Sequence, residues 1–210
     1  MKLLLALAVL AFPLSLTAQP ANELGVFVSL PKFDSTTIVD PELGIEIELD
    51  FDEDMGYGVS YNRYWTPNLS TEFAVQNLGG DLEATVTDGT TRITVDAGEI
   101  NLMAYSGTVQ WHFARGGRFA PYVGGGVAYM TGDIDIPSDP DDPDFVENID
   151  LDNETTWLVN AGVNIGITDS IALAGDVKYI SYDPKAEGDT DEGRVDVNPL
   201  IFSAGVKFRF

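Results

Sequence analysis

The only histidine in the chain, His112, is the first residue to consider for catalysis. A serine hydrolase needs a serine, a histidine and an acidic residue that converge on one place. Ser106 lies six residues before His112 on the same predicted strand, which separates the two by about 20 Å at the usual rise per residue. The local sequence places no other serine beside His112. We therefore predict no catalytic residue and no enzyme activity, and we expect His112 to be a hydrogen-bonding neighbour.

Acidic residues dominate the charge of the chain, with 34 Asp and Glu against 11 Lys and Arg and a formal net charge of −23. Ten of the acids fall between residues 132 and 154, and carboxylate oxygens are ligands that Ca²⁺ prefers. This segment lacks the spacing and the glycine of an EF-hand. We therefore interpret it as a solvated, self-repelling loop and predict no metal and no cofactor, with calcium binding as the alternative. The negative field repels phosphates and argues against nucleic acid as a partner.

Alternation of apolar and polar residues predicts eight strands, because successive side chains of a strand point to opposite faces. The predicted strands cover residues 23–30, 56–65, 69–82, 99–113, 119–131, 155–166, 171–182 and 199–210. Three short turns, near Pro67, Gly116 and Asp169, alternate with long polar segments at 33–55, 87–96, 132–154 and 183–195. Short turns on one side and long loops on the other are typical of a membrane barrel with both termini on the periplasmic side.

Bulky apolar residues fall on the outward face of nearly every predicted strand, and aromatic residues fall at the strand ends. A soluble lipocalin-like barrel or a sandwich would also alternate, but neither needs an apolar outer face. No segment after the N-terminal one reaches the roughly 18 apolar residues of a membrane helix. Only helices and closed barrels satisfy every backbone group in lipid. We therefore predict an all-β fold, an eight-stranded antiparallel up-and-down transmembrane β-barrel.

The two ends of the chain agree with this fold. Residues 1–18 combine Lys2, an apolar run and a small residue, Ala18, before the expected cleavage, which is the pattern of a secretory signal peptide. Cleavage after Ala21 is the alternative, and residues 19–210 form one outer-membrane barrel domain. The chain has no Cys, so it has neither a lipid-anchored start nor a disulfide. The final Phe210 on an amphipathic strand resembles the signal that the bacterial outer-membrane assembly machinery recognises.

Alternation along each predicted strand identifies the residues that face the inside of the barrel, and the strand directions place them along the barrel axis. Those towards the periplasmic side form what we call the lumen floor: Glu72, Gln110, His112, Asp176, Lys207 and Arg209. Charges inside so narrow a barrel must pair, so we expect Asp176 and Glu72 to pair with Lys207 and Arg209 and to close the bottom. Those towards the outside form what we call the upper lumen: Leu102, Met130, Trp157, Leu158, Ile180, Tyr182 and Ile201.

Two interpretations of the upper lumen are open. It is an apolar pocket that binds small apolar ligands, or its residues pack against one another and plug a structural barrel. Gly124, Gly126 and Gly162 favour the pocket, since inward glycines leave gaps where side chains would otherwise fill the barrel. A register slip of one residue would invert every assignment on a strand, and the Gly-rich strand at 119–131 is most exposed to that error.

Three stretches are more specific than alternation alone. They are Gln110-Trp111-His112-Phe113 followed by residues 119–127, residues 160–163 followed through Thr168-Asp169 by 178–180, and Val197-Asn198-Pro199 followed by 205–210. In this order and spacing they resemble the outer membrane protein W family over residues 56–210. The resemblance implies an eight-stranded barrel with an apolar channel, linked to uptake of small hydrophobic molecules. The acidic loops and the enlarged third loop depart from the family.

The expected function is admission of small hydrophobic molecules through the upper lumen of a monomeric barrel in the outer membrane of a Gram-negative bacterium. The expected partners are outer-membrane lipids, small hydrophobic molecules and the outer-membrane assembly machinery. The alternative is a structural or adhesive barrel with a plugged lumen and functional acidic surface loops.

Overall fold

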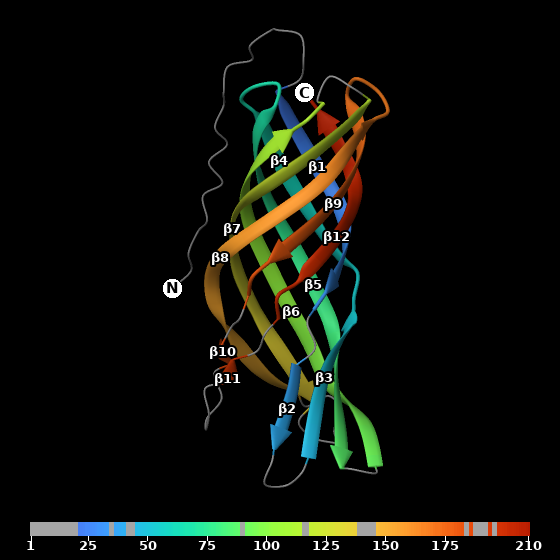
Figure 1. The fold of residues 1–210 in the computed structure, drawn as a ribbon, viewed down its shortest axis with the longest axis vertical. Coiled ribbons are helices and arrows are strands. Elements are labelled where there is room, and N and C mark those ends of the chain that lie inside the picture. Colours follow the sequence, from blue (N-terminus) through green and yellow to red (C-terminus); the bar gives the residue numbers. More distant parts are fainter. Residues whose placement is uncertain are drawn as a thin grey trace.

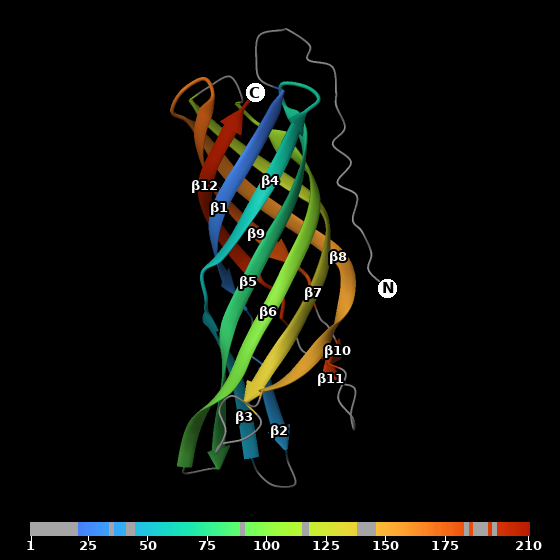
Figure 2. The same ribbon diagram turned by 180° about the vertical axis from the view of Figure 1, so that it is seen from behind.

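Eight antiparallel strands close into a barrel in the computed structural model, which describes residues 21–33, 36–40, 45–88, 91–114, 118–137, 146–182, 185–186, 193–194 and 197–210. The predicted signal peptide at 1–18 lies outside the described residues. The barrel strands are β1 (Asn22–Lys32), β4 (Gly56–Tyr64), β5 (Leu69–Asp88), β6 (Thr91–His112), β7 (Phe119–Pro137), β8 (Val146–Gly166), β9 (Ile171–Ile180) and β12 (Leu200–Arg209). Each pairs with the next, and β12 returns to pair with β1 (Figures 1 and 2). This up-and-down ring confirms the predicted fold class.

The outer face of the barrel carries a belt of exposed apolar side chains. On β7 the belt runs from Phe119, which is 59% exposed, to Tyr129, which is 44% exposed. The ten steps between these two residues span about 34 Å along the strand at 3.4 Å per residue, which at a tilt of about 40° is a height of about 26 Å. That height matches the apolar band of outer-membrane barrels, about 25 Å.

A row of aromatic residues lies along each edge of the belt. Towards the long-loop end, Tyr105 and Tyr129 lie with ring centroids 6.3 Å apart, and Trp157 and Tyr179 lie 5.6 Å apart. We call these four residues the outer aromatic row. Towards the chain termini, exposed aromatic side chains gather again, at Trp65, Trp111, Phe113, Phe119 and Phe210. Amphipathic rings favour the two membrane–water boundaries, so the two rows mark where the bilayer surfaces lie.

The four long polar segments contain more strand than the sequence predicted. The expected loop at 87–96 is largely the hairpin of β5 and β6, whose ladder continues to Asp88 and Thr91 after a register shift between Leu82 and Glu83. The other segments contain β2 (Thr36–Asp40), β3 (Ile45–Glu53), the ends of β7 and β8, β10 (Lys185–Ala186) and β11 (Gly193–Arg194). Threonine and valine favour strands even where polarity suggests a loop.

Two hairpins project beyond the barrel at the end opposite the C-terminus (Figures 1 and 2). They are formed by β2 with β3 and by the outer parts of β5 with β6, and β3 also pairs with β5. Across the described part of the chain, no helix has the length and apolar character needed to span a membrane.

Candidate functional site

The upper lumen is a single buried apolar cluster. Six of its seven predicted residues are at most 1% exposed: Leu102, Met130, Leu158, Ile180, Tyr182 and Ile201. The cluster also contains Ala104, which strand parity places inside as well, and residues that we did not predict: Leu78, Leu82, Ile100, Ala128, Ile134, Leu151 and Val197. Most of these share strand parity with predicted members, so continuing the alternation outward along β5 and β6 would have found Leu78 and Ile100.

Trp157 does not belong to the upper lumen, contrary to the prediction. Its side chain is 54% exposed on the outer face, whereas its neighbour Leu158 is 1% exposed inside. Adjacent residues of a strand point to opposite faces, so both cannot face the lumen. Trp157 instead packs against Tyr179 in the outer aromatic row, with the two rings tilted by 47°.

The gaps predicted at inward glycines are occupied. A Cβ at Gly162 would meet the Tyr122 ring, and one at Gly124 would meet the Asn160 side chain. At Gly126 a Cβ would meet the backbone of β6. These glycines therefore let neighbouring groups approach closely, and they do not leave open space in the barrel.

The lumen floor contains a buried ion pair between Glu72 and Lys207. The Lys207 Nζ donates to Glu72 Oε2 at 2.8 Å, and both side chains are less than 10% exposed. The Gln110 Nε2 donates to the other oxygen, Oε1, at 3.1 Å. The Glu72 carboxylate therefore accepts from two inward side chains, as charges in a low-dielectric interior require.

Arg209 and Asp176 do not pair as predicted. The Arg209 Nε donates to Glu23 Oε1 at 2.9 Å, and the Tyr64 hydroxyl donates to Glu23 Oε2 at 3.1 Å. Glu23 lies directly opposite Arg209 in the β1–β12 register, which sets this pair. Asp176 is held by hydrogen bonds instead.

Asp176 accepts two hydrogen bonds on one oxygen. The Tyr122 hydroxyl donates to its Oδ2 at 2.7 Å and the Asn160 Nδ2 donates at 2.9 Å. Just above, the Lys178 Nζ donates to Gln76 Oε1 at 2.7 Å. A cavity of about 30 Å³ lies among these groups, which is room for about one water molecule. The floor is therefore a polar network that fills the lower lumen.

His112 has a serine beside it that the local sequence did not predict. Its Nε2 lies 2.9 Å from Ser70 Oγ, across the β5–β6 pair, and its ring lies between those of Tyr64 and Tyr122. His112 and Ser70 are both 0% exposed. A nucleophile and its base must be open to a substrate, so this contact supports the barrel wall as a buried hydrogen bond.

The wall of the barrel is irregular between β7 and β8. Met130 pairs with Glu154 and Gly132 pairs with Leu151, so β8 has one residue more than β7 across this step. Such a bulge leaves part of the ladder unpaired. The hydroxyl of Tyr182 donates to the Asp152 backbone oxygen at 3.3 Å, which ties the top of the upper lumen to the bulge.

Tyr182 is held from a second side as well. Its backbone N donates to Asn198 Oδ1 at 2.9 Å, and its backbone oxygen accepts from Val197 N and Asn198 N. Asn198 adopts a positive φ of 31° to make this contact. Burial, and next the carboxylates of Glu154 and Asp152, raise the pKa of the Tyr182 hydroxyl, which keeps its proton for donation.

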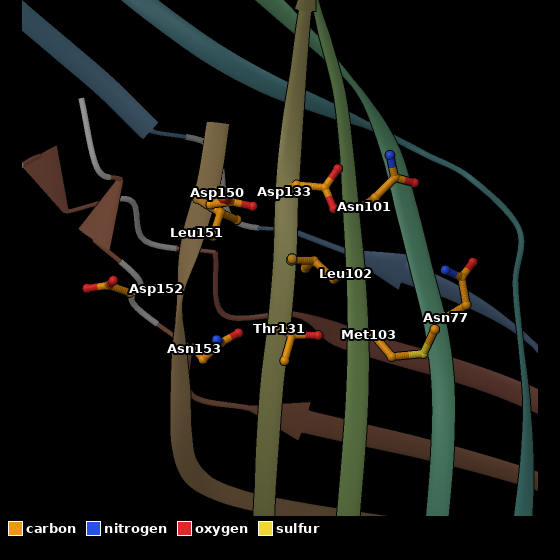
Figure 3. Close-up of a pocket in the computed structure, with 11 residues that line it drawn as sticks. Asn77, Asn101, Leu102, Met103, Thr131, Asp133, Asp150, Leu151, Asp152 and Asn153 are labelled. Atoms are coloured by element: carbon orange, nitrogen blue, oxygen red, sulfur yellow. The ribbon is translucent and has the colours of Figure 1, made fainter. Parts of the chain in front are cut away.

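A cavity of about 530 Å³ lies on the outside of the wall at this bulge. Figure 3 shows its lining residues on β5, β6, β7 and β8. Asn101 and Met103 share strand parity with the outward Tyr105, so the cavity faces the surroundings of the barrel. Leu102 and Leu151 contribute to both this cavity and the upper lumen.

Phe210 closes the ring of strands. Its backbone exchanges two hydrogen bonds with Asn22, at 3.0 and 3.1 Å, and its side chain is 58% exposed on the outer face. The last residue therefore completes both the β1–β12 ladder and the aromatic row near the termini.

Comparison with known proteins places the chain among outer-membrane barrels. The model of the OmpW family matches residues 26–210. An uncharacterized outer-membrane protein, y4mB of Sinorhizobium fredii, is 25% identical over 165 residues, which cover 74% of this chain and 70% of that protein.

Solved structures show the same fold. The outer membrane protein OprG of Pseudomonas aeruginosa has a TM-score of 0.69 at 18% identity, covering 91% of this chain and 97% of that one. Neisserial surface protein A has a TM-score of 0.61 at 14% identity, covering 90% and 97%. The barrel therefore resides in the outer membrane of a Gram-negative bacterium, and the chain belongs to the OmpW family.

Proposed function

We propose that this barrel admits small hydrophobic molecules from outside the cell into its upper lumen. The observation that carries the proposal is the stacking of one apolar cluster, drawn from β5 to β12, on a floor of paired charges. Small apolar molecules bind in concave apolar sites with few polar groups. The upper lumen has this composition, and it lies at the end of the barrel from which the long hairpins project.

A guest must displace side chains, because the upper lumen is closely packed. The contacts within the cluster are dispersion contacts without a preferred direction. Methionine adapts readily to a new shape around it. The cluster can therefore repack around a guest without leaving a polar group unpaired.

The floor sets the depth that a guest reaches. Passing it would separate Lys207 from Glu72, and removing one partner from a buried ion pair costs about 3–5 kcal/mol. An apolar guest offers no compensating hydrogen bond. It stops above Gln76 and Lys178, and its exit lies sideways at the β7–β8 bulge, where Leu151 of the cluster borders the interrupted ladder.

The partners in this proposal are small hydrophobic molecules, the outer-membrane lipids that cover the belt, and the assembly machinery that recognises the closing strand. The barrel acts as a monomer without nucleic acid and catalyses no reaction.

A structural or adhesive barrel is the second candidate. The close packing of the upper lumen favours it, since a plugged barrel would pack in the same way. The projecting hairpins of β2 with β3 and of β5 with β6 offer surface well beyond the belt (Figure 1). In that case the loops, and not the lumen, would carry the function.

Uptake of a hydrophobic fluorescent probe into proteoliposomes separates the two candidates. We expect Leu158→Glu to reduce uptake about tenfold or more, since an unpaired charge in the upper lumen would have to be desolvated by the guest. Thr155→Glu is the matched control, because it adds the same charge to the same strand at an exposed outward position. Equal uptake by both variants, in barrels shown to be inserted, would leave the structural candidate standing.

A further inference from the structure

Lys178 is a buried cation whose one direct partner is a neutral amide. Its residue is 3% exposed, and its Nζ donates to Gln76 Oε1 at 2.7 Å. Among the described residues, no carboxylate oxygen lies within 4.0 Å of this Nζ. An ammonium group carries three N–H donors, and a buried charge is costly unless it is paired as well as hydrogen-bonded. The ammonium group therefore has donors and charge that an anion could match.

The acids of the lumen floor are held by other partners. The two cations lower in the barrel, Lys207 and Arg209, each form an ion pair with a glutamate, at 2.8 and 2.9 Å. Asp176, two residues before Lys178 on β9, accepts from a tyrosine and an asparagine. Asp176 acts on Lys178 through the longer-range electrostatic field, without a hydrogen bond or an ion pair. The cation that lacks a direct counter-ion is thus the one nearest the apolar cluster.

Lys178 lies at the boundary between the lumen floor and the upper lumen. Its Cα is opposite Ile201 of β12 in the strand register, and Ile180 follows two residues later on the same face. Both isoleucines are 0% exposed members of the apolar cluster. The strands β5 and β9 are four strands apart in either direction round the ring. The hydrogen bond from Lys178 to Gln76 therefore spans the lumen directly beneath the cluster, and a guest would rest on it.

The Lys178 and Gln76 side chains have room to adjust. Both border the cavity of about 30 Å³ in the lumen floor, and lysine carries its charge on a flexible stem with rotatable donors. The Gln76 Nε2 donates to Ser29 Oγ at 3.1 Å, which anchors the amide independently of Lys178. An anionic oxygen can therefore join the ammonium group from above, on the N–H donors that Gln76 does not use.

The apolar cluster above Lys178 matches an extended alkyl chain. On β5 the cluster reaches from Leu78, the next inward residue after Gln76, to Leu82. The six steps from Gln76 to Leu82 span about 20 Å at 3.4 Å per residue, which at a tilt of about 40° is a height of about 16 Å. Aliphatic side chains surround that height. A guest with an apolar chain and one anionic end would match both the cluster and its base.

We propose that the upper lumen prefers medium-chain carboxylates, with the carboxylate on Lys178 and the alkyl chain in the apolar cluster. This inference rests on the proposed function, because the guest occupies the same lumen, and it names the chemical class of the guest. A hydrogen bond between ammonium and carboxylate is about twice as strong as one between neutral groups. An alkane gains only the apolar contacts, and an alkylammonium ion brings a like charge next to Lys178.

Chemical shifts of the Lys178 side chain test the pairing directly. The barrel carries ¹³C-labelled lysine in nanodiscs of zwitterionic lipid, and octanoate, octane and octylammonium are added separately at neutral pH. We expect octanoate to shift the Lys178 Cε resonance saturably and to bind about tenfold tighter than the other two, as a charge-assisted contact predicts. Equal affinity for octanoate and octylammonium, or octanoate binding without a shift at Lys178, would overturn the proposal.

Variants separate the charge of Lys178 from its packing. Lys178→Met keeps a long side chain but removes the ammonium group, and Lys178→Gln keeps a donor but no charge. Both should weaken octanoate binding about tenfold, because the carboxylate would be buried without a counter-ion, and both should leave octane binding unchanged. Lys32→Met is the matched control, since Lys32 is exposed on β1, and it should change neither affinity. Octanoate binding of wild-type strength in both Lys178 variants contradicts the assignment.

Octane distinguishes a failure of this inference from a failure of the proposed function. If octane shows NOEs to Ile180 and Ile201 but octanoate binds no more tightly than octane, the upper lumen takes guests and Lys178 does not select them. If neither molecule binds inside the barrel, the proposed function is wrong and this inference is wrong with it.

Discussion

The upper lumen and the lumen floor occupy the same barrel but are held together in different ways. The floor consists of directional contacts between named atoms, such as Lys207 with Glu72 and Arg209 with Glu23. The upper lumen consists of non-directional contacts among aliphatic side chains. Directional pairs specify one arrangement, whereas apolar packing tolerates repacking at constant volume. One barrel therefore combines a part that can accommodate a guest with a part that stops it.

Removing one partner of the floor ion pair should have the largest effect on stability. Lys207→Met leaves Glu72 buried without its cation, which costs about 3–5 kcal/mol. The double variant Glu72→Leu with Lys207→Met should recover most of the loss, because it leaves no buried charge unpaired. Urea unfolding in lipid vesicles measures both. A single variant as stable as the wild type would show that the pair does not hold the floor.

A truncation in the upper lumen should lower the free energy of unfolding somewhat less, and a bound apolar guest should restore part of that loss. Met130→Ala removes a side chain that is 0% exposed, which costs about 2–5 kcal/mol. Because the cavity left behind is apolar, an added alkane should recover part of that stability, and it should not rescue Lys207→Met. Equal rescue of both variants would remove the distinction between the two regions.

The closing strand tests whether the ring depends on its last residue. Phe210→Asp removes an exposed aromatic side chain from the boundary row but leaves its backbone pairing with Asn22 intact. We expect a several-fold lower yield of heat-modifiable, membrane-inserted barrel, and a thermal stability close to wild type once the barrel has folded. Wild-type yields in cells would show that the terminal residue is not an assembly signal.

Removing the hydrogen bond that links the upper lumen to the barrel wall should have the smallest effect on stability. Tyr182→Phe removes the hydrogen bond to the Asp152 carbonyl and keeps the ring, at a cost of about 0.5–1.5 kcal/mol. Hydrogen exchange should increase at residues 151–153 and stay constant at the floor, for example at residue 207. Unchanged exchange at the bulge would mean that Tyr182 does not restrain it.

Strand parity explains how much of this arrangement could be predicted. A period of two assigns each residue to a face, which is why Leu158 and Ile201 were placed inside correctly. The same rule excludes Trp157, because it is the neighbour of the inward Leu158, so that assignment departed from the pattern. Thr94, which shares a hydrogen bond with Thr85 within the long hairpin, was assigned to the loop at 87–96 because its polarity outweighed its strand propensity.

Parity does not say which residues on different strands meet. The pairs of Arg209 with Glu23 and of Ser70 with His112 depend on inter-strand register, and a single sequence fixes register weakly. The bulge at Gly132 shifts that register by one residue on β8 alone. The wall cavity that results from it was therefore beyond sequence reasoning, although its acids were visible as a charged segment.

The most direct test of guest binding in the upper lumen is to locate a small alkane in the folded barrel. Methyl groups of Leu, Ile and Val are protonated in an otherwise deuterated barrel, octane is added, and intermolecular NOEs are measured. We predict NOEs from octane to Leu158, Ile180 and Ile201 inside the upper lumen. NOEs confined to outward methyl groups such as those of Val127 and Val159, which are 57% and 47% exposed on the belt, would contradict it.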